Sequence, residues 1–249
     1  MQLQLIRNAM LRLNYGGRQF IIDPALAAKH SRPSYIGVSP NPLVDLPMPA
    51  HDVVSDIEMA IISHLHSDHF DSEAEALLPK TLPIFCQPAD AARLREKGFA
   101  AVTPVEDSIT WAGLSLSRTP GEHGAGAWAK QLGPVSGFVF RAENEPTVYW
   151  AGDTIWCEVV KRVIEETQPD IIITHSSGAI LGDSGPIVMD AAQTIVVCQA
   201  APQATVIATH LESLDHGMVS RAELREAAEA AGIQPNQLLI PADGEILRF

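Results

Sequence analysis

Hydrophobic and polar residues follow one another along the chain in two recurring patterns. Short apolar runs of strand length are separated by amphipathic stretches of helix length, which is typical of a protein that contains both elements. The apolar runs predict strands at 3–13, 20–22, 59–62, 114–117, 137–140, 147–151, 171–174, 205–209 and 238–240. The amphipathic stretches predict helices at 72–78, 89–97, 155–167, 189–199 and 221–231.

Turn and cap residues support several of these boundaries. Gly16 and Gly17 separate the first two predicted strands, and such a pair is typical of a tight hairpin turn. Ser220 precedes the last predicted helix and can cap it, and Glu223 can complete a capping box. Gly232 stands where that helix should end.

The order of the elements indicates the fold class. The early strands follow one another in a meander, whereas the later strands alternate with helices. This mixture favours an α/β (α+β) sandwich over a doubly wound parallel sheet. The chain also carries no glycine-rich loop of the dinucleotide-binding or P-loop type. A chain of 249 residues can bury one substantial core, so we expect a single domain over residues 1–249.

Two segments follow neither pattern. Residues 24–53 contain six prolines and cannot form regular structure over most of their length. Residues 121–136 are rich in glycine and include His123. Long irregular segments often act as lids or binding loops. For residues 24–53, a rigid surface excursion is an equal alternative.

A dense group of metal-binding side chains follows the apolar run 59–62. His64, His66, Asp68 and His69 lie within six residues, and imidazoles and carboxylates are preferred ligands of borderline divalent metals such as zinc. An extended backbone sends alternate side chains the same way, so His64 and His66 can close on one ion. A turn can then deliver Asp68 and His69 to a second ion. A lone HxH is weak evidence, but this density at a strand end predicts a metal site.

Further ligand types occur where later strands give way to loops. His123 follows the strand predicted at 114–117, Asp153 follows 147–151, and His210 follows 205–209. Site residues are commonly held in such positions. Taken singly, His123 could be a loop histidine, Asp153 a helix cap and His210 a hydrogen-bonded residue at a strand end. Their recurrence after the dense motif favours one shared site.

The order HxHxDH, then His, then Gly-Asp-Thr, then His resembles the metallo-β-lactamase superfamily of metal-dependent hydrolases. The resemblance covers nearly the whole chain and includes Asp23 in the early Ile-Ile-Asp segment. More narrowly, the chain resembles the branch that contains ascorbate-6-phosphate lactonase and relatives of N-acylphosphatidylethanolamine phospholipase D. The resemblance implies a four-layer αββα sandwich with the site along one edge between two sheets.

The resemblance also implies a division of ligands between two divalent ions. His64, His66 and His123 would hold one ion, and Asp68, His69 and His210 would hold the other, with Asp153 bridging them. Asp23 would orient a ligand histidine. We expect zinc first, with manganese or iron as alternatives, because nitrogen and carboxylate ligands suit all three metals.

Such a centre predicts hydrolysis. Metal-bound water loses its proton near neutral pH, at a pKa of roughly 7 in zinc enzymes, and the resulting hydroxide can attack a carbonyl or phosphoryl centre. We count Asp68 among the catalytic residues as well as the ligands. His175 and His216 are candidates to protonate the leaving group or bind substrate, although strand-end histidines are often only hydrogen-bonded.

Charge and composition bound the substrate and the partners. The formal net charge is −13, and lysine and arginine never cluster. Because nucleic-acid binding needs a basic stripe, we expect a small-molecule substrate and no nucleic acid. No apolar run is long enough to span a bilayer, so we expect no stable membrane association. The sequence leaves open whether the protein forms a homo-oligomer.

Cysteine usage and the N-terminus bear on localisation. Cys86, Cys157 and Cys198 are too few and too scattered for a disulfide framework. The first residues lack the features of a signal peptide. We therefore expect a cytoplasmic protein.

Several functions compete for the same motif. Two divalent ions would leave the centre with a net positive charge after Asp68, Asp153 and a hydroxide are counted, so we expect a small, anionic substrate. An ester or lactone is favoured over a phosphodiester because the chain lacks basic clusters. A phosphodiesterase is the enzymatic alternative, and a non-catalytic metal-binding protein is the alternative from another class. A phospholipase would need an exposed apolar surface, for which residues 36–48 are the candidate.

Overall fold

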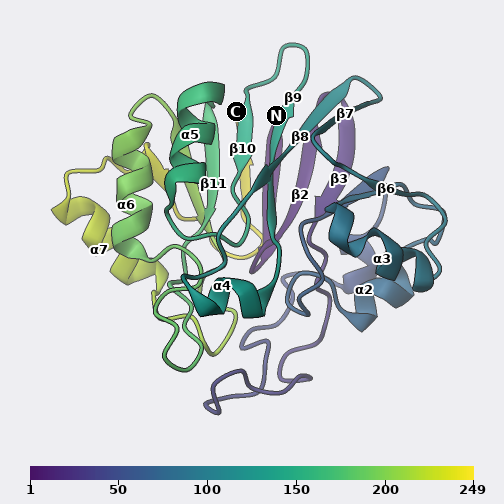
Figure 1. The fold of residues 1–249 in the computed structure, drawn as a ribbon, viewed down its shortest axis with the longest axis horizontal. Coiled ribbons are helices and arrows are strands. Elements are labelled where there is room, and N and C mark those ends of the chain that lie inside the picture. The colour runs from purple at the N-terminus through teal and green to yellow at the C-terminus, as the bar shows by residue number, and fades with distance from the viewer.

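Two seven-stranded sheets pack face to face and carry helices on their outer sides (Figure 1). The computed structural model describes residues 1–249. Helices α2 (Ser72–Leu77) and α3 (Ala91–Glu96) cover one sheet, and α5 (Glu158–Thr167), α6 (Ala191–Ala200) and α7 (Arg221–Ala230) cover the other. The predicted αββα sandwich is therefore confirmed.

The first sheet runs from antiparallel to parallel. Its strands, in spatial order, are β14 (Ile246–Arg248), β1 (Gln2–Arg7), β2 (Met10–Tyr15), β3 (Arg18–Ile22), β4 (Met59–Ile62), β5 (Ile84–Cys86) and β6 (Val102–Pro104). Pairing is antiparallel from β14 to β3 and parallel from β3 to β6. The apolar run 3–13 is not one strand, because Asn8 adopts a φ of 59° and turns the chain between β1 and β2. The hairpin turn at Gly16 and Gly17 is confirmed, both with positive φ.

The second sheet has the same mixed character. Its strands, in spatial order, are β13 (Leu238–Leu239), β12 (Thr205–Thr209), β11 (Ile171–His175), β10 (Val148–Trp150), β9 (Ser136–Arg141), β8 (Leu114–Pro120) and β7 (Ser108–Trp111). Pairing is parallel from β13 to β10 and antiparallel from β10 to β7. Four strands were not predicted from the sequence: β5, β6, β7 and β14.

The predicted helices lie where the sequence placed them, but several begin or end at other residues than predicted. Helix α7 begins at the predicted capping box, in which the Ser220 hydroxyl and the Glu223 carboxylate hold each other's backbone N–H groups. Helix α5 begins at Glu158, three residues later than the predicted 155. Helix α6 begins after Asp190, whose side chain accepts a hydrogen bond from the Gln193 N–H. Two short helices, α1 (Ala50–Val53) and α4 (Ala127–Leu132), and a 3₁₀ turn at Pro88–Asp90 complete the set.

The largest apolar cluster lies between the sheets and draws on both. Phe20 and Leu11 of the first sheet pack in it with Phe138, Phe140 and Trp150 of the second. Each of these side chains is at most 1% exposed, and burying a side chain of this size contributes roughly 1.5–3 kcal/mol. This shared core fixes the position of one sheet relative to the other. It thereby also fixes the relative positions of the strand ends at the edge of the sandwich.

The carboxyl ends of β3, β4, β10, β11 and β12 meet at one edge of the sandwich, at the bottom of Figure 1. The two chain ends lie at the opposite edge, where the Met1 ammonium donates to the Phe249 carbonyl at 3.0 Å. Helix α4 and the loop from 24 to 49 lie at the bottom edge as well. Loops from both sheets can therefore build one site there.

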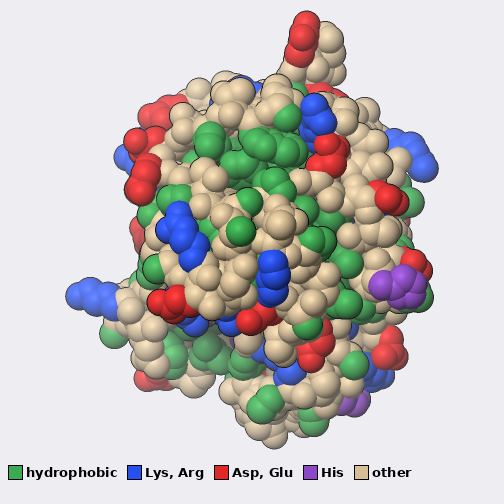
Figure 2. All heavy atoms as spheres, turned by 90° about the vertical axis from the view of Figure 1, so that its right-hand side faces the viewer, with side chains coloured by type: hydrophobic (Ala, Val, Ile, Leu, Met, Phe, Trp, Pro, Cys, Tyr) green, Lys and Arg blue, Asp and Glu red, His purple; other side chains and the backbone are tan.

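The charge of the surface and the length of the helices are relevant to binding of nucleic acid or membrane. On the face that carries α2, α3 and β6, lysine and arginine side chains stand singly among acidic ones (Figure 2). None of the helices is both long enough and apolar enough to cross a membrane.

Candidate metal centre

Histidines and aspartates from both sheets converge at the bottom edge of the sandwich. His64, His66, Asp68 and His69 follow β4, His123 follows β8, Asp153 follows β10, and His210 follows β12. Their potential ligand atoms form two groups, each with all atoms within 4.8 Å of one another. The first group contains His64, His66, His123 and Asp153, and the second contains His69, Asp153, His175 and His210.

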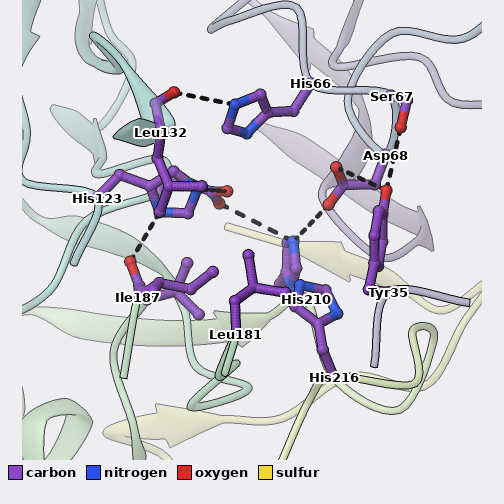
Figure 3. Close-up of a pocket in the computed structure, with 12 residues that line it drawn as sticks. Tyr35, His66, Ser67, Asp68, His123, Leu132, Leu181, Ile187, His210 and His216 are labelled. Atoms are coloured by element: carbon purple, nitrogen blue, oxygen red, sulfur yellow. Dashed lines mark hydrogen bonds and ion pairs between the residues drawn. The ribbon is translucent and has the colours of Figure 1, made fainter. Parts of the chain in front are cut away.

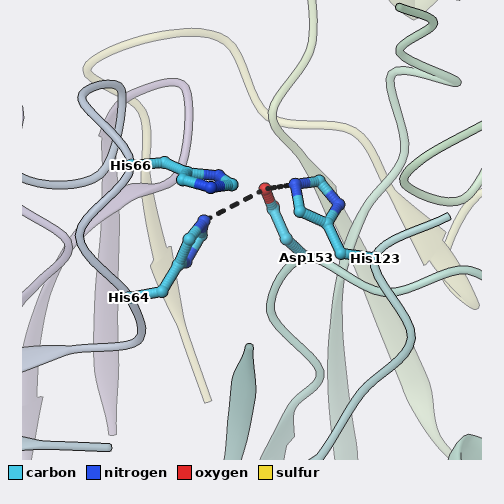
Figure 4. A group of neighbouring side chains, drawn as sticks. All are labelled: His64, His66, His123 and Asp153. Atoms are coloured by element: carbon cyan, nitrogen blue, oxygen red, sulfur yellow. Dashed lines mark ion pairs between the residues drawn. The ribbon is translucent and has the colours of Figure 1, made fainter. Parts of the chain in front are cut away.

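The first group closes around one carboxylate oxygen (Figure 4). Oδ2 of Asp153 lies 3.7 Å from Nε2 of His64 and 3.4 Å from Nε2 of His123. The far nitrogen of each ring is held by a protein oxygen: Ser63 Oγ at 2.8 Å for His64 Nδ1, Ile187 O at 2.8 Å for His123 Nδ1, and Leu132 O at 3.0 Å for His66 Nε2. Such bonds fix the tautomer, so Nε2 of His64 and His123 and Nδ1 of His66 are left for a metal.

The second group uses the same bridging carboxylate. Nε2 of His69 lies 3.1 Å from Asp153 Oδ2 and 3.5 Å from Asp68 Oδ2. Nε2 of His210 lies 3.4 Å from Asp68 Oδ2 and 3.9 Å from Asp153 Oδ1. Asp68, His69 and His210 thus converge, and they share Asp153 with the first three histidines.

Three of the converging nitrogens show whether this site fits a metal ion. Nε2 of His64, His69 and His210 is buried and has no hydrogen-bond partner in the protein. A buried polar atom without a partner costs about 1–3 kcal/mol, and native proteins leave few of them. All three atoms point at carboxylate oxygens across gaps of 3.1 to 3.9 Å. One cation in each group would give all three atoms a partner, so the donor set fits divalent metal ions.

Asp23 lies behind two of the histidines. It is fully buried and accepts from Nδ1 of His69 at 2.7 Å. It also accepts from the backbone N–H of Ser63 at 2.8 Å and from the Ser63 hydroxyl at 2.7 Å, and that hydroxyl in turn holds His64. One carboxylate at the end of β3 therefore orients a histidine in each metal group.

Burial and mutual charge set the pKa values in this cluster. Burial lowers the pKa of His64 and of His123. Burial alone would raise the pKa of Asp68 and of Asp153, but nearby histidines, His69 first, hold both pKa values well below the usual range. Both carboxyl groups are therefore ionised, as metal ligands must be.

His175 lies within ligand distance of the second group but has no free ring nitrogen. Nδ1 lies 2.6 Å from Asp153 Oδ1, and Nε2 accepts from the Trp150 indole N–H at 3.2 Å. The ring is fully buried, and His175 does not line the pocket. The expected role in leaving-group protonation has no route to substrate here. The geometry favours a different role, that of holding Asp153 in place, and we take Asp68 as the fourth member of the second group.

A pocket of about 190 Å³ opens over the two groups (Figure 3). One wall consists of groups that converge on the candidate metal positions, from His66, Asp68, His123, Asp153 and His210. The rest of the lining is mainly apolar and comes from Tyr35, Ser67, Leu132, Leu181, Ile187, Val188 and His216. Leu132, the last residue of α4, joins the two walls, because its carbonyl holds His66 and its side chain lines the pocket.

His216 lies in the pocket wall, where the sequence placed a candidate for substrate contact. Its ring packs against Tyr35 at 4.7 Å between centroids, and its Nδ1 has no partner. Burial lowers the pKa of His216 to about 4, so the ring is neutral near pH 7. Its contact with substrate stays a prediction.

Tyr35 is a pocket residue that sequence reasoning missed. Its hydroxyl lies 3.1 Å from Ser67 Oγ and 3.4 Å from Asp68 Oδ1. Burial raises the pKa of Tyr35 above its usual value, so the hydroxyl keeps its proton near pH 7. No spacing signal marks it, because Tyr35 stands alone in the proline-rich segment far ahead of the histidine motif.

Asp215 anchors that segment over the pocket. Its carboxylate accepts from the Ser34 hydroxyl, from the backbone N–H of Tyr35 at 3.0 Å and from Asn41 Nδ2 at 2.7 Å. The backbone N–H groups of Ile36 and Ser39 lie 3.4 Å away from it. Although burial acts to raise it, these hydrogen bonds hold the pKa of Asp215 well below the usual range. Loop 24–53 therefore reaches the site, and the part around Tyr35 is held in a defined conformation.

This fold, with histidines and aspartates at the edge between two sheets, defines a class of metal-dependent hydrolases. Residues 18–211 match the family described as Beta-lactamase superfamily domain, and the chain belongs to that family. The predicted superfamily is thereby confirmed. The narrower likeness to ascorbate-6-phosphate lactonase and N-acylphosphatidylethanolamine phospholipase D relatives stays a prediction.

Individual relatives match over the full length of the chain. It is 35% identical to the UPF0173 protein YddR of Bacillus subtilis (strain 168), over 100% of both chains. The crystal structure of isothiocyanate hydrolase from Delia radicum gut bacteria superposes with a TM-score of 0.95 at 36% identity and covers 100% of this chain and 99% of that one. The possible metal-dependent hydrolase of Veillonella parvula DSM 2008 gives a TM-score of 0.95 at 32% identity, over 99% and 98%. The chain is accordingly a metal-dependent hydrolase.

Proposed function

We propose that this enzyme hydrolyses small uncharged electrophiles that carry an apolar substituent, isothiocyanates first, at a centre of two divalent ions with zinc preferred. The observation that carries the proposal is the pocket itself. Its reactive side has five histidine and aspartate side chains, and its facing side has Leu132, Leu181, Ile187 and Val188. The likeness to an isothiocyanate hydrolase over the whole chain supports the same substrate class.

The residues that line the pocket indicate which substrate charge it can accept. The sequence predicted an anionic substrate from the positive charge that two metals would leave. None of the twelve residues that line the pocket is a lysine or an arginine, the groups that usually grip carboxylate or phosphate. The apolar wall would instead leave part of a charged molecule desolvated without a partner, which costs free energy. An uncharged electrophile meets no such cost.

The reaction follows from the chemistry of the isothiocyanate group. When bound, divalent ions lower the pKa of water to roughly 7 and polarise the electrophile. The oxygen of water bonds to the central carbon and both bonds of the carbon–nitrogen double bond break. Nitrogen keeps both electron pairs and takes both protons of the water: R–N=C=S + H₂O → R–NH₂ + COS. Asp153 and Asp68 lie on the side of the pocket where the metal ions would bind, and the Tyr35 hydroxyl lies beside Asp68, 3.4 Å from its Oδ1. We assign to that hydroxyl the atom of the substrate that gains negative charge.

Small esters and lactones present a similar electrophilic carbon to the same groups. They are therefore the second substrate class that we propose to compare. Phosphodiesters are the contrasting class, because their anionic group would face the apolar wall. A protein that binds metal without turnover is the remaining alternative.

A substrate panel with defined metal content tests the proposal. The protein is stripped with a chelator, reloaded with Zn²⁺, Mn²⁺ or Fe²⁺, and its metal content is measured by mass spectrometry. Methyl isothiocyanate, p-nitrophenyl acetate, γ-butyrolactone and bis(p-nitrophenyl) phosphate are then compared, with amine release reporting the first reaction. We expect two ions per chain, highest kcat/KM for the isothiocyanate, and no activity in His66→Ala. Preference for the phosphodiester, or no turnover of any substrate with full metal occupancy, would overturn the proposal.

A further inference from the structure

A second hollow lies directly outside the pocket. It has a volume of about 600 Å³ and is lined by Tyr35, Ile36, Gly37, Ile180, Gly182 and Met218. The inner pocket measures about 190 Å³ and lies over the candidate metal positions. The inner space can accommodate the reacting group, whereas a larger substituent would have to extend out of it.

The two spaces adjoin, because the same three chain segments line both. Tyr35 lines both hollows, and its neighbours Ile36 and Gly37 line only the outer one. In the second segment, Leu181 faces the inner pocket while Ile180 and Gly182 face the outer hollow. In the third segment, His216 faces inward and Met218 faces outward. A molecule that leaves the inner pocket between these segments therefore enters the outer hollow.

Backbone contacts hold the three segments together. Asp215 accepts from the backbone N–H of Tyr35, next to His216 in the third segment. The Ile180 N–H donates to the His216 carbonyl at 3.0 Å, and the Met218 N–H donates to the Ser177 carbonyl at 2.8 Å. The walls of the outer hollow are consequently preformed, and a ligand would not have to order them.

The outer hollow has the chemistry of an apolar binding surface. Its lining is apolar apart from the two glycines and the tyrosine hydroxyl, and it carries no charged side chain. Met218 is 48% exposed and Tyr35 is 36% exposed, so two large side chains have apolar surface left to bury. Covering such surface stabilises a complex by roughly 25 cal/mol for each Å².

We propose that the outer hollow is the subsite for the apolar substituent of the substrate, an alkyl or aryl group attached to the reacting centre. This inference rests on the proposed function for the identity of the reacting group. Tyr35 is the shared wall: its hydroxyl faces the metal ligands, and its ring faces the substituent. The hollow thus selects among substrates by the size of the group that does not react.

A series of substituents tests the subsite in the zinc-loaded enzyme. Methyl, n-butyl and benzyl isothiocyanate are compared in the wild type and in Met218→Ser. Val38→Ser is the matched control, because Val38 is 75% exposed on the same loop as Ile36 but does not line the hollow. We expect kcat/KM to rise about tenfold from methyl to benzyl in the wild type, from the apolar area covered. Met218→Ser should lose about three- to tenfold on benzyl and less than twofold on methyl. Val38→Ser should match the wild type, and Met218→Leu should keep the preference.

A binding measurement separates the subsite from the reaction. N-benzylacetamide and N-methylacetamide cannot be hydrolysed as isothiocyanates, and their binding is followed by NMR titration of the zinc-loaded protein. The benzyl compound should bind at least tenfold more tightly, and Met218→Ser should weaken it while Val38→Ser should not. Binding of the benzyl compound without turnover of methyl isothiocyanate would refute the proposed function and keep the subsite. Equal kcat/KM for methyl and benzyl substrates, or equal effects of the two serine variants, would overturn the subsite.

Discussion

The Tyr35 hydroxyl lies 3.4 Å from Oδ1 of Asp68, whose other oxygen faces His69 and His210 at 3.5 and 3.4 Å. A loop residue thus contacts the outer oxygen of a carboxylate whose inner oxygen faces a candidate metal position. The same hydroxyl borders the pocket. This position allows Tyr35 either to contact substrate or to orient Asp68, and the two roles differ in what they predict.

Tyr35→Phe removes only that hydroxyl. If it donates to charge that develops on the substrate, kcat should fall about a hundredfold with KM changed much less. Zinc content and affinity should stay at the wild-type values. Ser67→Ala, which removes the other partner of the hydroxyl, should change kcat only a few-fold. A loss of zinc affinity in Tyr35→Phe would show instead that the tyrosine acts by orienting Asp68.

Asp23→Asn tests the carboxylate behind the metal ligands. An asparagine keeps the size but offers one acceptor oxygen where Asp23 receives three hydrogen bonds. Loss of such an orienting partner typically costs 10- to 100-fold in metal affinity. We expect that loss for zinc, measured by competition with a chromophoric chelator. Asp52→Asn changes an exposed carboxylate and should bind zinc as the wild type does.

His175→Phe separates positioning from proton transfer. Because both nitrogens of His175 are engaged by Asp153 and Trp150, the variant should lower kcat and zinc affinity together by roughly 10- to 100-fold. His175→Asn, which can still donate to Asp153, should recover part of both. The shape of the pH–rate profile should not change. Loss of one limb of that profile with normal zinc binding would restore the proton-donor role.

Asp215→Ala should weaken the fold in a pH-dependent way. Hydrogen bonds to a charged group contribute about 1.5–3 kcal/mol, so we expect a loss of about that size in the free energy of unfolding at pH 7. The folded pKa of Asp215 lies below its unfolded value. Its contribution is therefore fully present above the unfolded value of roughly 4 and is lost as the pH falls through the folded one. Urea unfolding of the metal-free wild type and variant at pH 7 and pH 3 should show the gap narrowing. A gap that stays constant would exclude the charge as its source.

The sequence predicted the sandwich, and it predicted which histidines and aspartates would lie together at its edge, because both depend on local order. The close spacing of His64, His66 and His69 marks them as candidate ligands. Asp153 and His210 are marked by their positions at predicted strand ends. The role of His175 could not be obtained in this way. Its place on β11 was correctly predicted, but the depth at which the strand ends, behind Asp153 and against Trp150, depends on packing between strands.

The pocket wall was the least predictable part. Tyr35 reaches Asp68 from a proline-rich loop that is held by Asp215, a residue remote in sequence. The contact from Leu132 to His66 uses a backbone carbonyl, which every residue has and no motif can mark. Helix α4 itself arose in a segment that composition indicated to be irregular. Tertiary contacts of loops, unlike strand periods, leave no trace in residue order.

The carbonyl of Leu132 holds the ring of the candidate ligand His66, and this hydrogen bond has a consequence for how such enzymes can diverge. A change that moves the end of α4 to admit a different reacting group would also disturb this hydrogen bond, so pocket shape and metal binding would change together at this position. Met218 and Ile36 carry no such bond to a ligand. Substitutions in the outer hollow can therefore change which substrates are accepted while the reactive centre stays the same.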